Sequence, residues 1–490
     1  MYFIGIDLGT SATKLLLMDE TGAIRNIVSR SYPLSMPRPG WSEQDPACWV
    51  RAAFEGIREL TADVDRSEVK GISVAGQMHG LVALDEADNV LRPAILWNDG
   101  RTEAETRWLN EEIGVDFLAA HTGNIAFAGF TAPKLLWMRK NEPELFAKIR
   151  KVMLPKDYLI YVLTGTHSCD PSDASGMLLF DVEHRCWSKE MLEVCGLQES
   201  LMGRIFESWE PVGTLTNAAA SELGLSASVL VTAGAGDNAA AAIGTGTVGK
   251  GRCNVSLGTS GTLFLSDDRY ACPENHALHS FCHADGGWHL MGVELSSASC
   301  LSWWAGILGA DDLAAEQAGI SAEKLGKNQL FFLPYLMGER TPHNDAAARG
   351  AFIGMSMDST RADMTQAVLE GVAFAIRDSV EAARAQGIRI RSSMICGGGA
   401  KSPLWRTILA NVLGITLTVP KTEQGPSYGA AILAAVSAGQ FPTVHDCAAQ
   451  WVTVSQVVTP DPALTAKYET QYRRWQKLYP ALKDFYKGGN

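Results

Sequence analysis

Short apolar runs alternate with longer amphipathic stretches along the whole chain. Residues 71–75 and 229–233 are continuous apolar runs of the length of a buried strand. Residues 144–152 and 361–385 carry apolar side chains at helical spacing, which predicts two helices, the second of them long and buried. We therefore predict an α/β protein in which mixed sheets are flanked by helices.

One pattern of strand, turn and strand occurs twice. The apolar run from Phe3 passes through Leu-Gly-Thr-Ser at residues 8–11 into a second apolar run, and residues 253–266 repeat this order through Leu-Gly-Thr-Ser at residues 257–260. Each copy has the form of a β-hairpin. Because the copies lie about half the chain length apart, we predict two similar lobes around a central cleft, residues 1–245 and 246–490.

The glycine-rich segment 244–251 joins the predicted lobes. Its Gly244-x-x-x-x-Gly249-Lys250 resembles a phosphate loop, but Gly251 stands where that loop needs a Ser or Thr for magnesium. The same glycines fit a dinucleotide fingerprint, yet a helix-like run precedes them and a strand follows, which reverses the required order. We interpret the segment as a turn between elements and as a candidate hinge.

Composition and charge exclude several classes of protein. The 490 residues are 46% hydrophobic and 20% charged, which rules out a disordered or fibrous chain. The formal net charge of −12 disfavours general binding to nucleic acids or anionic membranes, although a pocket of backbone N–H groups can still hold a small anion. Asp7 comes too early for a signal peptide and no apolar run approaches ~18 residues, so we expect a cytoplasmic protein.

The ten cysteines form no Cys-x-x-Cys pair, which favours buried thiols over disulfides. One cluster offers potential zinc ligands: Cys272, His276, His279, Cys282, His283 and His289. Its spacing matches no standard zinc pattern. Residues 277–282 and 288–293 also alternate like strands, so we interpret the cluster as packed strand residues.

The first hairpin carries groups suited to a phosphate. Asp7 ends an apolar strand, where an aspartate is costly unless it is solvated, paired or near a metal. The turn and the next strand add a flexible backbone and donors: Gly9, Thr10, Ser11 and Lys14. An ordinary structural turn explains the same residues. The second copy, with Gly258 and Thr259, favours a site in which two hairpins hold a polyphosphate from both sides.

Asp237 is the second candidate acid. It follows the apolar run 229–233 and a Gly-Ala-Gly sequence, and it precedes an alanine-rich helix. An aspartate there can cap the helix by accepting its free N–H groups. It can equally serve as a general base at the carboxyl end of a strand, where α/β proteins bind ligands. The residues alone leave both interpretations open.

Three further loops follow predicted strands. Their candidate residues are Gly397, Gly398, Gly399 and Ser402 before a predicted helix over 403–413, Met78 and His79 between two apolar strands, and Trp97, Asn98 and Asp99 after a third. Consecutive glycines permit close approach of a ring or sugar, and the polar loops suit hydroxyl recognition. Each loop can also be purely structural.

Together these residues resemble the FGGY family of carbohydrate kinases, within the actin-like and hexokinase-like ATPase superfamily. The resemblance covers nearly the whole chain, from residues 4–11 to residues 425–430, and two family signatures are matched at residues 129–137 and 350–370. Further stretches resemble the branch that phosphorylates D-xylulose: residues 76–80, 93–101, 154–158 and 333–343. The resemblance implies two lobes with ribonuclease H-like mixed sheets.

The resemblance also implies roles for the candidate residues. Asp237 matches the family's catalytic base, and Asp7 matches the aspartate associated with the magnesium nucleotide. The implied sugar pocket comprises Met78, His79, Trp97, Asn98, Asp99 and Asp237. The implied ATP site comprises Gly9, Thr10, Ser11, Lys14, Gly258, Thr259, Gly397, Gly398, Gly399, Ser402 and, more weakly, Asn411.

The implied activity is transfer of phosphate from ATP, with Mg²⁺, to D-xylulose, giving D-xylulose 5-phosphate in D-xylose catabolism. A different ketopentose or pentitol, such as L-xylulose, ribulose or arabinitol, is the first alternative, because sequence does not locate hydroxyl partners. An inactive sugar- and nucleotide-binding regulator is the second, and the intact Asp7 and Asp237 argue against it. The expected partners are small molecules, with no nucleic acid or membrane, and family analogy adds a homodimer.

Overall fold

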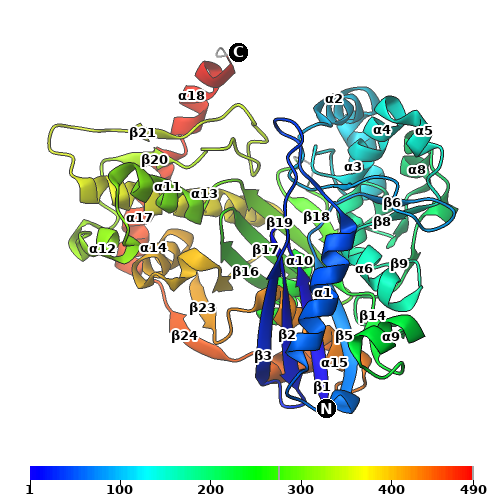
Figure 1. The fold of residues 1–490 in the computed structure, drawn as a ribbon. Helices are drawn as coiled ribbons and strands as arrows, with labels where there is room; N and C mark the ends of the chain where they lie inside the picture. The colour runs from blue at the N-terminus through cyan, green and yellow to red at the C-terminus, as the bar shows by residue number, and fades with distance from the viewer. Residues whose placement is uncertain (274–275, 488–490) are drawn as a thin grey trace.

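The protein forms two lobes, each built on a seven-stranded sheet with helices on its faces (Figure 1). The computed structural model describes residues 1–273 and 276–487. This arrangement confirms the predicted α/β class with mixed sheets. Within the described residues, no helix combines the length and the apolar character needed to cross a membrane.

The N-terminal sheet contains the first predicted hairpin. Its spatial order is β13 (Pro211–Thr214), β14 (Leu230–Thr232), β5 (Val69–Gly76), β1 (Tyr2–Leu8), β2 (Ala12–Asp19) and β3 (Ile24–Ser31), with β15 (Ala235–Gly236) also beside β5. Strands β1 and β2 are antiparallel, and Asp7 lies opposite Lys14. Strands β1 and β15 both run parallel to β5, so the carboxyl ends of all three strands lie at one edge.

Smaller elements extend the N-terminal lobe. Its short strands are β4 (Glu43–Gln44), β6 (Val82–Leu84), β7 (Ala94–Ile95), β8 (Lys151–Met153), β9 (Ser168–Cys169), β10 (Phe180–Asp181), β11 (Cys186–Trp187) and β12 (Arg204–Ile205). Its helices are α1 (Pro46–Leu60), α2 (Glu103–Trp108), α3 (Val115–Thr122), α4 (Thr131–Asn141), α5 (Pro143–Phe146), α6 (Pro155–Thr164), α7 (Pro171–Ala174), α8 (Lys189–Cys195), α9 (Asn217–Leu223) and α10 (Asp237–Gly244).

The helix predicted over residues 144–152 is wrong. Helix α5 ends at Phe146, and the chain then enters strand β8. The backbone N–H of Arg150 donates to the carbonyl of Leu84 at 2.8 Å, and β8 pairs antiparallel with β6. Pairing with a strand distant in sequence therefore outweighs the local helical spacing.

The C-terminal sheet contains the second predicted hairpin, β16 and β17. Its spatial order is β18 (His279–Cys282), β19 (Trp288–Glu294), β17 (Gly261–Asp267), β16 (Arg252–Leu257), β22 (Ser392–Cys396), β23 (Thr416–Pro420) and β24 (Val454–Val458), and β20 (Phe331–Leu333) pairs separately with β21 (Ala351–Ile353). The strands predicted in the histidine cluster are confirmed as β18 and β19, where His289 stacks on Phe264 with ring centres 3.9 Å apart. Among the described residues, no group of three or more His, Cys, Asp or Glu could hold a metal ion.

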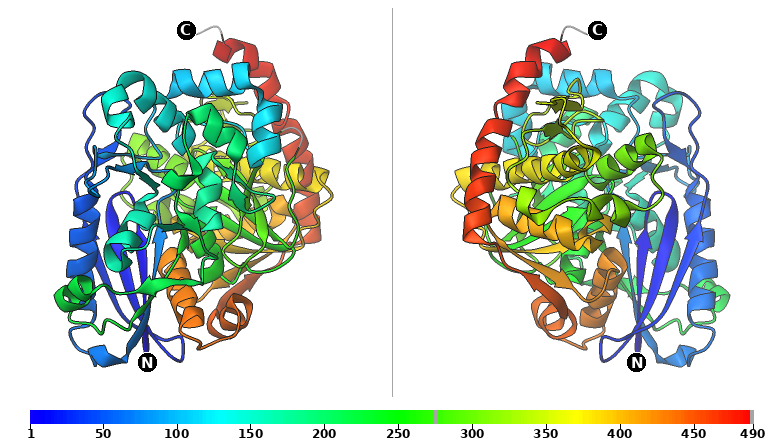
Figure 2. Two further views of the ribbon diagram at one scale, coloured as in Figure 1. Left: turned by 90° about the vertical axis from the view of Figure 1, so that its right-hand side faces the viewer. Right: turned by 90° about the vertical axis from the view of Figure 1, so that its left-hand side faces the viewer.

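Helices of the C-terminal half pack on both sheets. They are α11 (Ala298–Leu308), α12 (Leu313–Ala318), α13 (Arg361–Ala385), α14 (Pro403–Leu413), α15 (Gly425–Ser437), α16 (Val444–Trp451), α17 (Pro462–Trp475) and α18 (Leu478–Lys487). The long helix predicted over 361–385 is confirmed as α13. The C-terminal tail docks on this lobe: Tyr468, Tyr472 and Trp475 of α17 are buried, and α17 and α18 (red) run along the outside of the lobe (Figure 2).

Two helices join the lobes. Helix α10 leads out of the N-terminal half and packs closely on α15, which comes from the C-terminal half and also packs on strands β1 and β5. A Cβ atom at Gly429 or at Gly244 would overlap backbone carbonyl oxygens of the facing helix. Glycines at these two positions therefore allow the helix backbones to approach. The segment after α10 makes turns and leads directly into β16, as predicted for the glycine-rich segment.

Candidate active site between the lobes

The parallel strands bring the two candidate acids together. Asp7 on β1 lies opposite Ala75 of β5, and Gly236 of β15 lies opposite Gly76, so Asp7 and Asp237 both stand at the carboxyl ends of neighbouring strands. Ligands of open α/β sheets bind at such edges. The sequence alone predicted each aspartate at a strand end, and the sheet order explains why the two meet.

Burial raises the pKa of both carboxyl groups above the ordinary value of an aspartate. It raises the pKa of Asp7 to about 7, with a further rise from the charge of Asp237 and an opposing effect of Lys14. Burial also raises the pKa of Asp237 to about 6, against the lowering effect of hydrogen bonds from Asn238. A carboxylate with a pKa near neutrality is suited to accept a proton from an alcohol.

Asp237 is the first residue of helix α10 rather than its N-cap residue. The helix begins at Asp237 itself, and the capping position is occupied by Gly236, which provides no side chain. The Asp237 carboxylate instead accepts hydrogen bonds from the backbone N–H and side-chain amide of Asn238, at 2.7 and 3.0 Å. The backbone N–H of Asn238 is one of the free N–H groups of the first turn, so both interpretations left open by the sequence stay open. Asn238 itself was not singled out by sequence reasoning, because a lone amide after an aspartate carries no distinctive pattern.

A buried network holds the backbone just before Asp237. The Lys156 ammonium lies 2.9 Å from a carboxylate oxygen of Asp170 and donates to the carbonyl of Ala233 at 3.1 Å. The Ser172 hydroxyl donates to Asp170 and accepts the N–H of Gly236 at 3.1 Å. Nothing in the sequence indicates this role of Lys156, because only Asp157 is near it in sequence, and its other acidic partners, Asp170 and Asp173, lie in a different segment.

Met78 lies against this same backbone. A Cβ atom on Gly236 would approach the Met78 side chain to 3.1–3.3 Å, and the Asn238 amide nitrogen lies 4.0 Å from the Met78 sulfur. The site thus joins the loop after β5 to the start of α10. Met78 and Asp237, which the sequence placed in one pocket, are neighbours.

His79 is held in one orientation and one tautomer. Its φ of 70° lies in the left-handed region, and its carbonyl accepts hydrogen bonds from Thr131 and Lys134 at 3.0 and 2.7 Å. Its Nδ1 lies 2.7 Å from the carbonyl oxygen of Gly176. Because a carbonyl only accepts, Nδ1 carries the proton and Nε2 is an acceptor. Burial lowers the pKa of His79 to about 3, so the ring is neutral. Such strained, supported residues are typical of functional sites.

The predicted loop 97–99 divides between exposed and buried groups. Trp97 is 47% exposed and its indole N–H donates to the Thr10 hydroxyl at 2.9 Å, while Asn98 is exposed. Asp99 is buried, and its two oxygens are taken up by the Arg101 guanidinium and the backbone N–H of Ser42. Asp99 therefore anchors the loop, and its predicted contact with a sugar stays a prediction.

The first hairpin turn is tied to the same neighbourhood. The Gly9 N–H donates to Ala12 within the turn, and the Thr10 hydroxyl donates to the Gln77 side chain at 3.1 Å. Ser11 is exposed, and Lys14 stands beside Asp7 on the neighbouring strand. The turn therefore exposes the Ser11 hydroxyl, and the next strand places the Lys14 ammonium beside the Asp7 carboxylate.

The second hairpin turn and the triple-glycine loop lie together in the other lobe. The carbonyls of Gly258 and Thr259 accept the N–H groups that open helix α11, at 2.8 and 2.9 Å. Gly397 has a φ of 89°, and a Cβ atom there would lie 3.0 Å from the Gly258 nitrogen. Only glycine fits this position, so the two predicted nucleotide loops are in direct contact.

Two cavities flank the triple-glycine loop. One of about 630 Å³ is lined by Gly398, Gly399 and Ser402 together with α11, α12 and α14, and another of about 360 Å³ is lined by Gly397 and Gly398. Asn411 lines neither cavity; its amide is buried and bonded to Thr407, and its oxygen accepts the N–H of Asp461. Asn411 therefore fixes the start of α17, and its predicted nucleotide contact stays a prediction.

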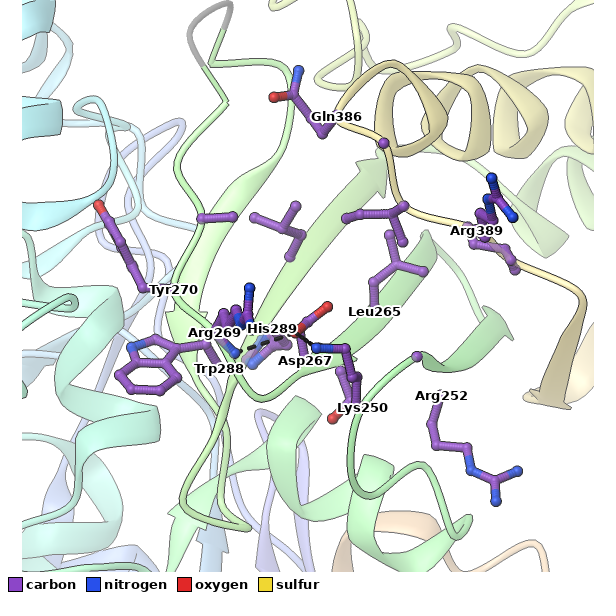
Figure 3. Close-up of a pocket in the computed structure, with 17 residues that line it drawn as sticks. Lys250, Arg252, Leu265, Asp267, Arg269, Tyr270, Trp288, His289, Gln386 and Arg389 are labelled. Atoms are coloured by element: carbon purple, nitrogen blue, oxygen red, sulfur yellow. Dashed lines mark hydrogen bonds and ion pairs between the residues drawn. The ribbon is translucent and has the colours of Figure 1, made fainter.

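A third cavity, of about 580 Å³, lies at the opposite ends of β16 and β17 (Figure 3). It is lined by several cationic side chains, among them Lys250, Arg252 and Arg389. Lys250 is paired with Asp267 and Asp268, and Arg252 points away from that pair. The charges diverge, so this cavity does not form a focused anion site.

The site has the donor chemistry of a hard divalent cation. Asp7 and Asp237 are two carboxylates at one strand edge, and Lys14 is the cation that acts on Asp7. Mg²⁺ is held in proteins by one or two carboxylates together with phosphate oxygens and water. The pair therefore fits Mg²⁺ bound with a polyphosphate.

Comparison with known proteins identifies relatives over the full chain. Family models for the N-terminal and C-terminal domains of the FGGY family of carbohydrate kinases match residues 2–244 and 253–438. A xylulose kinase of Escherichia coli is 42% identical over 487 residues, covering 98% of this chain and 99% of that protein.

Solved structures agree in fold. A xyloylose kinase from Brucella ovis has a TM-score of 0.94 at 43% identity, covering 99% of this chain and 100% of that one. A gluconate kinase from Lactobacillus acidophilus has the same TM-score at 26% identity, covering 100% of this chain and 99% of that one. The same fold thus occurs in proteins named for different sugars, so fold alone does not select the substrate.

Proposed function

The chain belongs to the FGGY family of carbohydrate kinases, and we propose that it transfers the γ-phosphoryl group of ATP to D-xylulose, giving D-xylulose 5-phosphate and ADP. Members of this family use ATP to phosphorylate an alcohol group. The choice of D-xylulose is supported by full-length similarity to xylulose kinases. Fold similarity does not contribute to this choice.

We assign proton transfer to Asp237. In the proposed reaction the terminal hydroxyl of the sugar gives its proton to the Asp237 carboxylate while its oxygen attacks the γ-phosphorus, and the bond to the β-phosphate oxygen breaks to release ADP. The observation that carries this assignment is the convergence of Asp237, Met78 and the neutral His79 at the strand edge shared with Asp7.

The other candidate residues supply binding. The two hairpin turns, 9–11 and 258–259, suit the phosphates, and the loop 397–399 with its flanking cavities suits the adenosine. Bound Mg²⁺ would neutralise charge on the phosphate oxygens. Asp7 is our candidate for its protein ligand, and Lys14 adds a positive charge beside Asp7. We propose residues 1–245 and 246–490 as the lobes that contribute these parts, and the ten free cysteines support a reducing, cytoplasmic setting.

The test is an ADP-release assay with MgATP and a panel of acceptors. D-xylulose, L-xylulose, D-ribulose, D-arabinitol and glycerol are compared with a blank that contains no sugar. The highest kcat/KM for D-xylulose is expected. A higher value for another acceptor would retain the kinase but overturn the substrate, and no release above the blank would favour a binding-only protein.

The variant Asp237→Asn separates chemistry from binding. It keeps the shape of the side chain and removes the base, so kcat should fall by a factor of about 10²–10⁴. Affinity for D-xylulose, measured by calorimetry, should change little. Retention of wild-type kcat would show that a different group accepts the proton.

A further inference from the structure

Arg340 is a cation with no acidic partner among the described residues, at the boundary between the lobes. It lies in the loop between β20 and β21 of the C-terminal lobe. Its backbone N–H donates to Glu339 at 2.8 Å, but within residues 1–273 and 276–487 its guanidinium makes no hydrogen bond or ion pair. Other enclosed arginines are paired: Arg101 is held by Asp99, and Arg185 by Glu207.

The backbone fixes Arg340 in this unpaired position. The next residue, Thr341, forms two hydrogen bonds with Val293 of β19, both at 3.0 Å. The adjacent carboxylate of Glu339 does not pair with the guanidinium, since its Oε1 accepts the N–H groups of Leu295 and Arg340. The backbone at Arg340 is therefore fixed to β19, and the carboxylate of Glu339 forms no ion pair with the Arg340 guanidinium.

Arg340 reaches across to the sugar side of the proposed active site. Its guanidinium carbon lies 4.7 Å from the centre of the Phe127 ring, which belongs to the N-terminal lobe. Phe127 packs on Phe130, with ring centres 5.5 Å apart, and Phe130 stacks on His79 at 4.6 Å. The charge of Arg340 is one of the lesser causes, after burial, of the lowered pKa of His79. Arg340 and His79 therefore lie close to each other, on either side of the Phe127–Phe130 pair.

The unpaired groups of this region complement each other chemically. A guanidinium stacked on an aromatic face still presents N–H donors along its edge, and it cannot lose its charge. His79 presents an acceptor at Nε2, as its tautomer requires. Arg340 is half-buried and its guanidinium keeps some contact with water, so an oxygen-rich ligand can take the place of that water as the acceptor. A ketose brings a carbonyl oxygen and several hydroxyls, which can satisfy both groups.

We propose that Arg340 is a direct sugar ligand, whose guanidinium donates hydrogen bonds to carbonyl or hydroxyl oxygens of the ketose bound beside His79. This inference rests on the proposed function. The phosphate-accepting hydroxyl must lie at Asp237, next to Met78, whereas Arg340 stands against Phe127, which is linked to His79 through Phe130. Arg340 therefore contacts the end of the sugar that is not phosphorylated, and this contact comes from the C-terminal lobe.

The test compares two substitutions at Arg340 with a matched control. Arg340→Gln removes the charge, and Arg340→Lys keeps the charge but loses the planar set of donors. Arg391→Gln makes the same change at an exposed arginine that also has no ion pair with any residue of the described part of the chain. We expect Arg340→Gln to raise the KM for the sugar at least tenfold, Arg340→Lys to raise it less, and Arg391→Gln to leave it unchanged. The KM for ATP should stay within twofold in all three variants.

Analogues of the substrate separate direct contact from a structural effect. In the wild type, 1-deoxy-D-xylulose and other monodeoxy ketoses should lose kcat/KM wherever the missing oxygen is a partner of Arg340. In Arg340→Gln that particular loss should disappear, because the donor is already gone. Equal losses in wild type and variant for every analogue would overturn the proposal. An unchanged sugar KM in Arg340→Gln, or equal rises in the KM values for sugar and ATP, would overturn it as well.

The proposal can fail independently of the substrate assignment. The variants are assayed with whichever acceptor the wild type prefers, so a wrong sugar in the panel does not decide the role of Arg340. Thermal unfolding of each variant, read by tryptophan fluorescence, accompanies the kinetics. If Arg340→Gln does not fold, Arg340→Lys carries the test through its smaller rise in sugar KM and its response to the same analogues.

Discussion

At the scale of single residues, the protonation of Asp237 should govern how the rate depends on pH. Burial raises the pKa of Asp237 to about 6, and the base must be ionised to accept a proton. We predict that kcat/KM for the sugar is constant at higher pH and falls about tenfold per unit below pH 6. Steady-state assays from pH 5 to 9 at fixed ionic strength measure this. A flat profile down to pH 5 would contradict the assignment of Asp237 as the base.

Asp7 should reduce the stability of the free protein at neutral pH. Its pKa is raised to about 7 by burial and by Asp237, well above that of an exposed aspartate. A raised pKa stabilises the fold at low pH, and this contribution is lost as the pH rises through the folded-state value. We predict that Asp7→Asn, in the absence of metal and nucleotide, is more stable than wild type by about 1–3 kcal/mol at pH 8.

Chemical denaturation of wild type and Asp7→Asn at several pH values tests this prediction. The difference in the free energy of unfolding should be small near pH 4 and should grow up to about pH 7, where Asp7 becomes fully ionised. A surface control, Asp446→Asn or Asp116→Asn, should show no such growth. An equal difference at pH 4.5 and pH 8 would mean that Asp7 acts through packing alone.

Sequence reasoning at this scale found the residues whose setting is local. Asp7 and Asp237 were identifiable because an acid at the end of an apolar strand is unusual. Asp99 is different: its neutralising contact with Arg101 is a matter of side-chain direction, which a sequence does not display. Arg340 lies in the stretch 333–343 that resembles the family, but the sequence gives it no role. The lack of an acidic partner for its guanidinium becomes visible only when the two lobes are placed together.

At the scale of elements, local patterns succeeded where the element forms from neighbouring residues. Both β-hairpins and helix α13 were predicted, because turn residues and helical spacing depend only on residues close together in sequence. The segment 144–152 failed because strand β8 is created by pairing with β6, about 70 residues away in sequence. The packing of α15 against α10 likewise depends on glycines that have no local function.

The contact of α10 with α15 should be intolerant of a single methyl group. A Cβ atom at Gly429 would overlap the carbonyl oxygen of Ala240 and would lie 3.0 Å from the nitrogen of Gly244. Backbone atoms, unlike the end of a flexible side chain, cannot move away unless the helix shifts. We predict that Gly429→Ala lowers the free energy of unfolding by about 1–3 kcal/mol. Gly306→Ala is the matched control, since Gly306 is also helical and has open space around it.

The control substitution should have the opposite sign. Alanine is preferred over glycine within a helix, so Gly306→Ala should be neutral or stabilising by up to about 1 kcal/mol. Thermal and denaturant unfolding of both variants provide the comparison. If Gly429→Ala unfolded like Gly306→Ala, the helices would have room to separate, and the junction between the lobes would be looser than its backbone contacts indicate.

At the scale of the whole molecule, the parts of the proposed site are divided between the lobes. Asp7, Met78 and Asp237 belong to the N-terminal half, whereas the second hairpin turn, the triple-glycine loop and Arg340 belong to the C-terminal half. Both halves must meet the substrates at once for phosphoryl transfer. Water competes with the sugar as a nucleophile, so a closed state that excludes it protects ATP.

We therefore predict that the lobes close when both substrates are bound. Small-angle scattering should show a smaller radius of gyration with D-xylulose plus a nonhydrolysable ATP analogue than with either ligand alone, because only together do they bridge the two halves. Arg340→Gln should weaken the part of this change that depends on the sugar, since it removes a contact from the C-terminal lobe. An unchanged radius with both ligands present would mean that the active site is already assembled, and that exclusion of water depends on side chains rather than on lobe motion.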